Sequence, residues 1–215
     1  GSALRDFAVW SALSEIHGTD WRQWPEELRD PRSTAAEEFA AAQAERVEFF
    51  EWLQWTAQQQ LSAAQTAAEE AGMGIGVLAD LAVGVGKTSA ETWLMGDVYA
   101  PGITVGAPPD QYNQGGQDWG QPPWNPLKLE ELEYEPFRVM VRAALNRVGG
   151  LRIDHIIGLF RLWWVPDGLG PSAGTYVRYN HEALIGILAL EAYRAQALVV
   201  GEDLGTVEPW VREYL

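Results

Sequence analysis

Residues 151–168, LRIDHIIGLFRLWWVPDG, place Arg152, Asp154 and His155 inside a run of apolar residues. Such a run predicts a half-buried strand, in which Arg152 and Asp154 point to one face and His155 to the other. Burying a guanidinium and a carboxylate among Leu, Ile and Phe costs folding free energy unless the two groups form an ion pair or serve in binding or catalysis. The stretch alone leaves two interpretations open: a structural Arg–Asp pair at the end of a strand, or a catalytic carboxylate.

Apolar runs on both sides of this segment predict further strands of the same sheet. We expect strands near 76–83, 151–155 and 197–202, separated by helices at 136–148 and 181–196. Strands that alternate with helices pair in parallel through right-handed crossovers. The active residues of such sheets gather at the carboxyl ends of the strands. The sequence therefore predicts an α/β protein with a parallel sheet in sequential order.

Three acidic side chains lie on or just after these strands: Asp80, Asp154 and Glu202. In a barrel, Asp154 and Glu202 would lie across one opening, because they end consecutive strands. Retaining glycoside chemistry needs two carboxyl groups about 5–5.5 Å apart, one as nucleophile and one as general acid and base. Arg152 would keep Asp154 ionised, and apolar neighbours would favour the protonated form of Glu202. The alternatives are carboxylates that cap loops and, for His155, a satisfied histidine at a strand end.

The N-terminal part of the chain predicts helices. Residues 3–17 predict a first helix. Thr34 and Glu37 form a capping box that opens a helical segment running to Gly72, either as one helix or as two with a break. Trp52 and Trp55 lie on this segment, and we expect them in the core.

Two later segments predict loops. Residues 96–127 are rich in Gly and Pro, and a loop of this length with several aromatic residues favours an ordered, functional segment. A second loop is predicted after the strand-forming stretch LRIDHIIGLF (151–160) and runs through Tyr179, and Thr206 is predicted to cap a last helix. Aromatic rings outside helices are what a carbohydrate site needs, because sugar C–H faces stack on flat rings.

Composition excludes several classes of function. With 15 basic and 30 acidic residues the formal net charge is −15, which disfavours binding to nucleic-acid phosphates. No apolar run reaches the length of a membrane span. The absence of cysteine excludes thiolate catalysis and fits a reducing compartment, and three scattered histidines disfavour a metal site. GVGKTSAE at 84–91 is similar to a phosphate-binding loop, but Leu81 stands where the pattern requires its first glycine.

Four segments together resemble the amylomaltase (4-alpha-glucanotransferase) family, glycoside hydrolase family 77. They are GAPPDQYNQGGQDWGQPPW (106–124), LRIDHIIGLFRLWWVPDG (151–168), GTYVRY (174–179) and GEDLGTV (201–207). The stretch WRQWPEELRDP at 21–31 is also similar to that family's helical region. The resemblance covers nearly the whole chain, and its segments follow the family's order.

The resemblance implies a fold and a set of site residues. The fold would be a partial TIM (β/α)8 barrel of about three parallel strands, with residues 1–74 as an inserted helical subdomain. Residues 75–215 would be the central part of the barrel, including an active-site loop at 106–126. Asp154 would be the nucleophile and Glu202 the general acid and base, with Asp80 in a supporting role. The substrate-binding residues would be Arg152, His155, Tyr112, Gln117, Trp119 and Asp110.

The activity that the resemblance implies is transfer of α-1,4-glucan segments between maltooligosaccharides by a retaining double displacement, in the cytoplasm. We expect no cofactor, no metal ion, no nucleic acid and no membrane as partner. The family's third carboxylate, in a His-Asp motif after a later strand, does not occur before Leu215. We therefore expect an internal piece of the enzyme, inactive alone and associating with itself through exposed sheet edges. A retaining α-glucoside hydrolase and a non-catalytic glucan-binding module are the alternatives.

Overall fold

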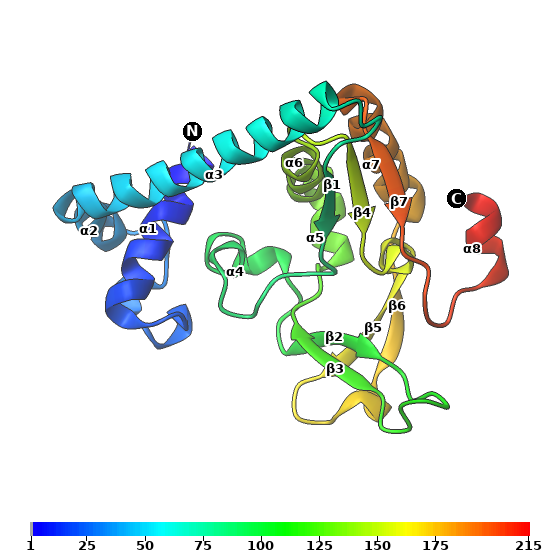
Figure 1. The fold of residues 1–215 in the computed structure, drawn as a ribbon. Helices are drawn as coiled ribbons and strands as arrows, with labels where there is room; N and C mark the ends of the chain where they lie inside the picture. Colours follow the sequence, from blue (N-terminus) through cyan, green and yellow to red (C-terminus); the bar gives the residue numbers. More distant parts are fainter. Residues whose placement is uncertain (1) are drawn as a thin grey trace. The chain divides into compact units, whose positions relative to one another are not determined.

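The computed structural model describes residues 2–215 (Figure 1). Contacts group these residues into two compact units, each built from two stretches of the chain. One unit comprises residues 2–61 and 85–99, and the other comprises residues 62–84 and 100–215. The division of the chain at residue 74 into a helical subdomain and a barrel part stays a prediction.

The first unit is helical. The helix predicted over 3–17 is confirmed, and the predicted long helical segment consists of two helices that meet at Gln43. The cap is Ser33 and not Thr34, because Ser33 has the extended backbone of an N-cap and its Oγ accepts the amide hydrogen of Ala36 at 3.1 Å. The elements are α1 (Ser2–His17), η1 (Trp21–Gln23), η2 (Glu26–Leu28), α2 (Thr34–Ala42), α3 (Ala44–Glu70), α4 (Ala90–Leu94) and η3 (Gly96–Val98). Of α3, residues 62–70 belong to the second unit.

The core of this unit is built around two indole rings. Trp24 and Trp93 meet edge to face with ring centroids 5.7 Å apart, and both side chains are buried. On α3, Val47 packs into this core. The prediction that Trp52 and Trp55 are core residues is wrong, since they are 52% and 58% exposed. Helical spacing directs only one side of α3 toward the core, and these two rings lie outside it.

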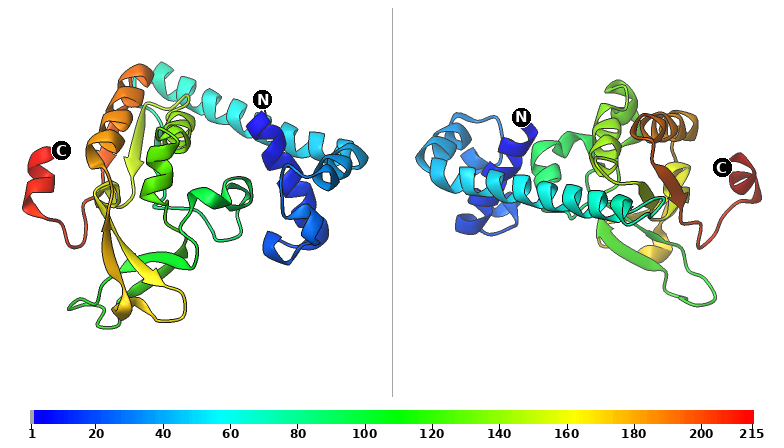
Figure 2. Two further views of the ribbon diagram at one scale, coloured as in Figure 1. Left: turned by 180° about the vertical axis from the view of Figure 1, so that it is seen from behind. Right: turned by 45° about the horizontal axis from the view of Figure 1, so that its top comes forward.

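The second unit contains a parallel sheet formed by β1 (Leu78–Leu81), β4 (Gly150–Ile153) and β7 (Leu198–Gly201). Its order β1–β4–β7 confirms the predicted sequential parallel pairing. Two helices, α6 (Glu135–Ala144) and α7 (His181–Ala195), cover one face of this sheet, as the left view of Figure 2 shows. This is the strand–helix–strand arrangement expected of a barrel segment.

All three parallel strands are shorter than the predicted ranges 76–83, 151–155 and 197–202, and the middle one ends early. β4 ends at Ile153 and not at residue 155, because His155 adopts the left-handed backbone region with φ of 54°. The chain then forms η4 (Ile156–Leu159). Asp154 therefore lies in the turn that closes the strand, at the carboxyl end of the parallel sheet.

A second, antiparallel sheet is formed by segments that were predicted to be loops. Its strands are β2 (Ile103–Ala107), β3 (Gln117–Gln121), β5 (Arg161–Pro166) and β6 (Thr175–Arg178), in the order β3–β2–β5–β6. Both loop predictions are wrong in these parts, because β2 finds its partner in β5, far along the chain. Pairing between distant segments supplies order that local Gly and Pro content does not reveal. Figure 1 shows this sheet beyond the carboxyl ends of the parallel strands.

The remaining elements are short: α5 (Pro126–Glu131), η5 (Pro171–Ala173) and α8 (Pro209–Tyr214). The prediction that Thr206 caps the last helix is wrong, since Glu208 occupies the N-cap position of α8. Leu151 of β4 and Val105 and Val165 of the antiparallel sheet are almost fully buried, so each sheet has a packed interior. Within residues 2–215, no helix is both long and apolar enough to cross a membrane.

Candidate active site

The turn that carries Asp154 is held by the chain that follows β7. The Asp154 amide donates to the carbonyl of Leu81 at 2.9 Å, so the turn stays attached to β1. On the other side, the Glu202 amide donates to the Ile153 carbonyl, and the Glu202 carbonyl accepts from the amide of Ile156, both at 2.9 Å. The backbone of Glu202 thus brackets the turn between β4 and η4.

The side chain of Glu202 adds a third attachment. Its Oε2 accepts the amide hydrogen of His155 at 2.8 Å, and its Oε1 accepts that of Leu204 at 2.7 Å. The sequence predicts apolar surroundings for this carboxylate, whereas the structure gives it two backbone donors. Counted along bonds, Oε2 lies within about 6 Å of the Asp154 Cα. Each oxygen keeps a second lone-pair position for a proton or a ligand.

Arg152 holds the other side of the site. Its Nη1 donates to both carboxylate oxygens of Asp80, at 2.7 and 2.9 Å, and its Nη2 donates to Oδ1 of Asp154 at 3.0 Å. These bonds, those to Asp80 foremost, raise the pKa of Arg152 above its ordinary value. The Arg–Asp pair predicted from the sequence is therefore present. Within residues 2–215 no cluster of three His, Asp or Glu side chains is placed to hold a metal ion.

A cavity of about 450 Å³ opens in front of the two carboxylates. Asp154, His155 and Glu202 line it from the carboxyl ends of the parallel strands, and the antiparallel sheet supplies the opposite wall. A cavity of this size falls in the range of small-molecule sites. The lining from the antiparallel sheet and its hairpin includes Gly106, Asp110, Gln117, Trp119, Gln121, Trp163 and Tyr176.

A bulge in β3 directs Trp119 into this cavity. Gln121 pairs with Val105 and Asp118 pairs with Gly106, so Trp119 and Gly120 have no partner on β2. The Trp119 ring consequently lies edge to face with the His155 ring, with centroids 5.3 Å apart. Bulges next to active sites commonly redirect a side chain in this way.

The environment of His155 favours its neutral form. Burial lowers the pKa of this imidazole below its ordinary value, although the charges of Glu202 and Asp154 act in the opposite direction. A neutral imidazole carries one donor and one acceptor nitrogen, which suits a hydroxyl group that can do both. The His155 ring is thus a candidate for binding a polyol at the cavity wall.

The structure brings most of the predicted site residues to one cavity. The residues that line it are Asp154, Glu202, His155, Gln117, Trp119 and Asp110. Arg152 does not line it but donates a hydrogen bond to Asp154. Asp110 also accepts the amide hydrogens of Tyr112 and Asn113, at 2.8 and 2.6 Å, so it shapes the hairpin turn. Tyr112 is 90% exposed and does not line the cavity.

Sequence reasoning missed two aromatic residues of the cavity wall, Trp163 and Tyr176. Trp163 and Tyr176 line the cavity from β5 and β6, with ring centroids 4.9 Å apart, and Arg161 stacks over the Tyr176 ring at 4.0 Å. The signal that could have found them is the β-branched and aromatic content of RLWWVP and TYVR, which favours strands. Flat rings on this wall can stack against the C–H faces of a sugar.

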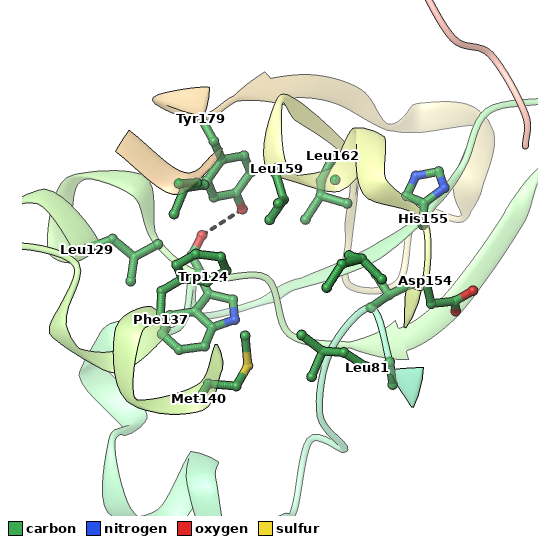
Figure 3. Close-up of a pocket in the computed structure, with 15 residues that line it drawn as sticks. Leu81, Trp124, Leu129, Phe137, Met140, Asp154, His155, Leu159, Leu162 and Tyr179 are labelled. Carbon is green, nitrogen blue, oxygen red and sulfur yellow. Dashed lines mark hydrogen bonds between the residues drawn. The ribbon is translucent and has the colours of Figure 1, made fainter. Parts of the chain in front are cut away.

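A second, smaller cavity of about 60 Å³ lies behind Asp154 (Figure 3). Apolar side chains such as Leu81, Phe137 and Met140 line it, and the Asp154 carboxylate points away from them. The buried Tyr179 hydroxyl donates to the Trp124 carbonyl at 2.8 Å, and burial raises the pKa of Tyr179 above its ordinary value. This cavity is a packing void behind the site. The carboxylates of Asp154 and Glu202 line the larger cavity.

Comparison with known proteins agrees with this geometry. The chain is 59% identical over 215 residues to the 4-alpha-glucanotransferase of Mycobacterium tuberculosis, and 41% identical over 199 residues to that of Haemophilus influenzae. The matches cover 100% and 93% of this chain, but the chain spans only 30% and 28% of the two relatives.

Two solved structures share the fold. Amylomaltase from Corynebacterium glutamicum aligns over 100% of this chain and 28% of its own, with a TM-score of 0.83 and 47% identity. Amylomaltase from Streptococcus agalactiae in complex with acarbose aligns over 98% of this chain and 43% of its own, with a TM-score of 0.86. At 20% sequence identity this is a likeness of fold alone. The 4-alpha-glucanotransferase family model matches residues 1–215. The chain therefore belongs to the 4-alpha-glucanotransferase family, glycoside hydrolase family 77.

Proposed function

We propose that this site serves a 4-alpha-glucanotransferase, which transfers α-1,4-glucan segments from one maltooligosaccharide to another in the cytoplasm. The observation that carries the proposal is the bond from the His155 amide to the Glu202 carboxylate, which holds Glu202 beside the turn that carries Asp154. Both carboxylates thus line one cavity with aromatic walls. The proposal concerns the full-length protein, since this chain spans about 30% of its relatives.

Asp154 acts as the nucleophile in this proposal. One of its oxygens is held by Arg152, and within residues 2–215 no hydrogen bond engages the other, so it is available to attack. Attack at the anomeric carbon forms a glycosyl-enzyme ester while the bond to the leaving 4-oxygen breaks. The guanidinium, itself fixed by Asp80, orients the carboxylate and stabilises its charge before the attack.

Glu202 acts as general acid and then as general base. In the first step it gives its proton to the 4-oxygen of the leaving glucan. In the second step it removes the proton from the 4-hydroxyl of an acceptor glucan, which attacks the anomeric carbon and releases Asp154. The two displacements together retain the configuration of the linkage. The wall of Trp119, Trp163 and Tyr176 supports the proposal because it offers stacking surfaces to a sugar chain.

The proposal is tested by substituting the two carboxylates in the full-length protein. Asp154→Asn and Glu202→Gln keep the shapes of the side chains, so transfer between maltotriose molecules should fall at least about 10³-fold while glucan binding persists. Asp97→Asn and Glu182→Gln are matched controls on exposed positions and should retain wild-type turnover.

The products separate the proposal from its alternatives. Free glucose without longer oligomers would identify a hydrolase, and near-normal turnover of the Asp154→Asn protein would exclude Asp154 as the nucleophile. Glucan binding without any turnover in the wild-type protein would indicate a binding module.

A further inference from the structure

Gln121 lies on the cavity wall but has no place in the mechanism above. It is the last residue of β3, pairs with Val105 of β2, and lines the same cavity as Asp154 and Glu202. Its side chain packs against the chain that follows β1, where a Cβ built on Gly84 would come within 3.3 Å of Gln121 Oε1. The amide therefore spans the space between the two sheets at the cavity.

The carbonyl oxygen of this amide is an unsatisfied acceptor. Oε1 is shielded from solvent and has no hydrogen-bond partner anywhere in residues 2–215. Nearly all buried acceptors in folded proteins are satisfied, because leaving one without a donor costs stability. An exception at the wall of a binding cavity calls for a functional explanation.

The two indole N–H donors that line the cavity are already engaged. Trp119 donates its Nε1 hydrogen to Gln117 at 3.0 Å, and Trp163 donates its own to the Pro171 carbonyl at 2.9 Å. The charged groups that line the cavity, those of Asp110, Asp154 and Glu202, are carboxylates, which accept hydrogen bonds when ionised. A ligand that fits this lining must bring donors of its own and present a face that stacks on aromatic rings. Sugar hydroxyls and C–H faces meet both requirements.

We propose that Gln121 Oε1 accepts a hydrogen bond from a hydroxyl group of the bound glucan and thereby sets specificity for that hydroxyl. This inference rests on the proposed function. The terminal torsion of a glutamine is soft, so the oxygen can turn toward the cavity while the backbone of β3 stays in place. The free protein thus keeps an acceptor without a donor, at a cost in stability, and the ligand supplies the missing donor.

The test combines one substitution with a set of ligands. Gln121→Met preserves the length of the side chain and removes its polar atoms. We expect the full-length variant to bind maltotetraose about tenfold more weakly than wild type, because a site built to bind a hydroxyl loses one hydrogen bond. Its melting temperature should stay equal or rise, since the unsatisfied acceptor is gone. Gln59→Met, on an exposed position of α3, is the matched control and should change neither quantity.

Maltotetraose analogues that each lack one hydroxyl identify the donor. Wild type should bind one analogue about tenfold more weakly than maltotetraose, whereas Gln121→Met should bind that analogue and maltotetraose equally. Unchanged affinity in Gln121→Met would overturn the inference and leave the proposed function standing. A loss of affinity together with a lower melting temperature would also overturn it, as a structural role. Failure of the wild-type protein to bind maltotetraose would instead reject the proposed function.

Discussion

At the scale of single residues, the site depends on Arg152, which donates hydrogen bonds to both Asp80 and Asp154. Its guanidinium binds Asp80 with one nitrogen and Asp154 with another, so a residue of β1 helps to orient the proposed nucleophile on the turn after β4. The planar fork of arginine makes this double attachment possible. Because the register places Asp80 beside Arg152, the network follows directly from the pairing of two parallel strands.

Arg152→Lys tests this sharing. A lysine ammonium is a single point charge, so it can approach Asp80 or Asp154 but cannot reproduce the fork. We expect kcat to fall about 10²-fold with little change in KM, since the loss affects the positioning of the nucleophile. Steady-state kinetics of the full-length protein measure this. Arg5→Lys on the exposed side of α1 should behave as wild type, and equal kcat in both variants would contradict the argument.

At the scale of elements, the approach of β3 to β2 decides where Trp119 points. The bulge in β3 requires Gly120 to take φ of 70°, a backbone region that favours glycine. At the start of β3 the two strands come so close that a Cβ on Gly106 would overlap the Gln117 carbonyl oxygen. The aromatic wall of the cavity thus depends on two backbone positions that carry no side chain.

Gly106→Ala should displace β3 from β2. A methyl group cannot fit against the Gln117 carbonyl, so the strand that carries Gln117 and Trp119 has to move. We expect maltotetraose affinity to fall about tenfold or more and the protein to lose about 1–3 kcal/mol of stability. Calorimetric titration and chemical unfolding measure the two effects.

Gly186→Ala provides the control for that substitution. Gly186 lies exposed in the middle of α7, where an added Cβ meets nothing within 4 Å. Alanine should therefore stabilise the helix by about 0.5–1 kcal/mol and leave glucan binding unchanged. Wild-type affinity in Gly106→Ala would show that the close approach of the strands does not position the wall.

At the scale of the whole molecule, the chain carries an excess of acidic residues, and one buried acidic side chain, Glu191, is neutralised by arginines. The formal charge of −15 makes the chain repel itself at neutral pH. Glu191 is buried in α7 and binds Arg142 of α6 at 2.8 and 2.9 Å, and Arg194 at 2.8 Å. Hydrogen bonds from Arg142, foremost, and from Arg194 lower the pKa of Glu191 to about 2. This pair joins the two helices that cover the parallel sheet.

Glu191→Gln should lower stability in a way that depends on pH. The folded-state pKa of about 2 lies below the ordinary value of 4.5, so the unfolded chain takes up the proton first. The contribution of Glu191 is therefore full above about pH 4.5 and is lost as the pH falls toward 2. Urea unfolding of both proteins at pH 7 and near pH 3 should show a large difference in unfolding free energy at pH 7 and a smaller one in acid. Glu182→Gln on the same helix should match wild type, and a difference independent of pH would contradict the assignment.

The sequence by itself determined the parallel sheet and the positions of its carboxylates. Apolar runs, helical spacing and their alternation are local signals, and they are enough to place Asp154 and Glu202 at the ends of neighbouring strands. Alternation along one strand predicted that Arg152 and Asp154 lie close together, and the structure shows their hydrogen bond, although Asp154 lies in the turn after β4. His155, predicted on the opposite face, lines the same cavity as Asp154.

Only the tertiary structure decided how the opposite wall of the site is built. β2 pairs with β5, with Ile103 opposite Pro166. No local sequence pattern predicts a strand partner that is so far away in the chain. The exposure of Trp52 and Trp55 likewise depends on which side of α3 meets a core, and hydrophobicity alone does not specify that. The bulge at Trp119, the amide donors to Glu202 and the unsatisfied oxygen of Gln121 all arise where distant segments meet. Composition and spacing describe a chain locally, whereas these contacts form only when the two sheets of the second unit close around a common cavity.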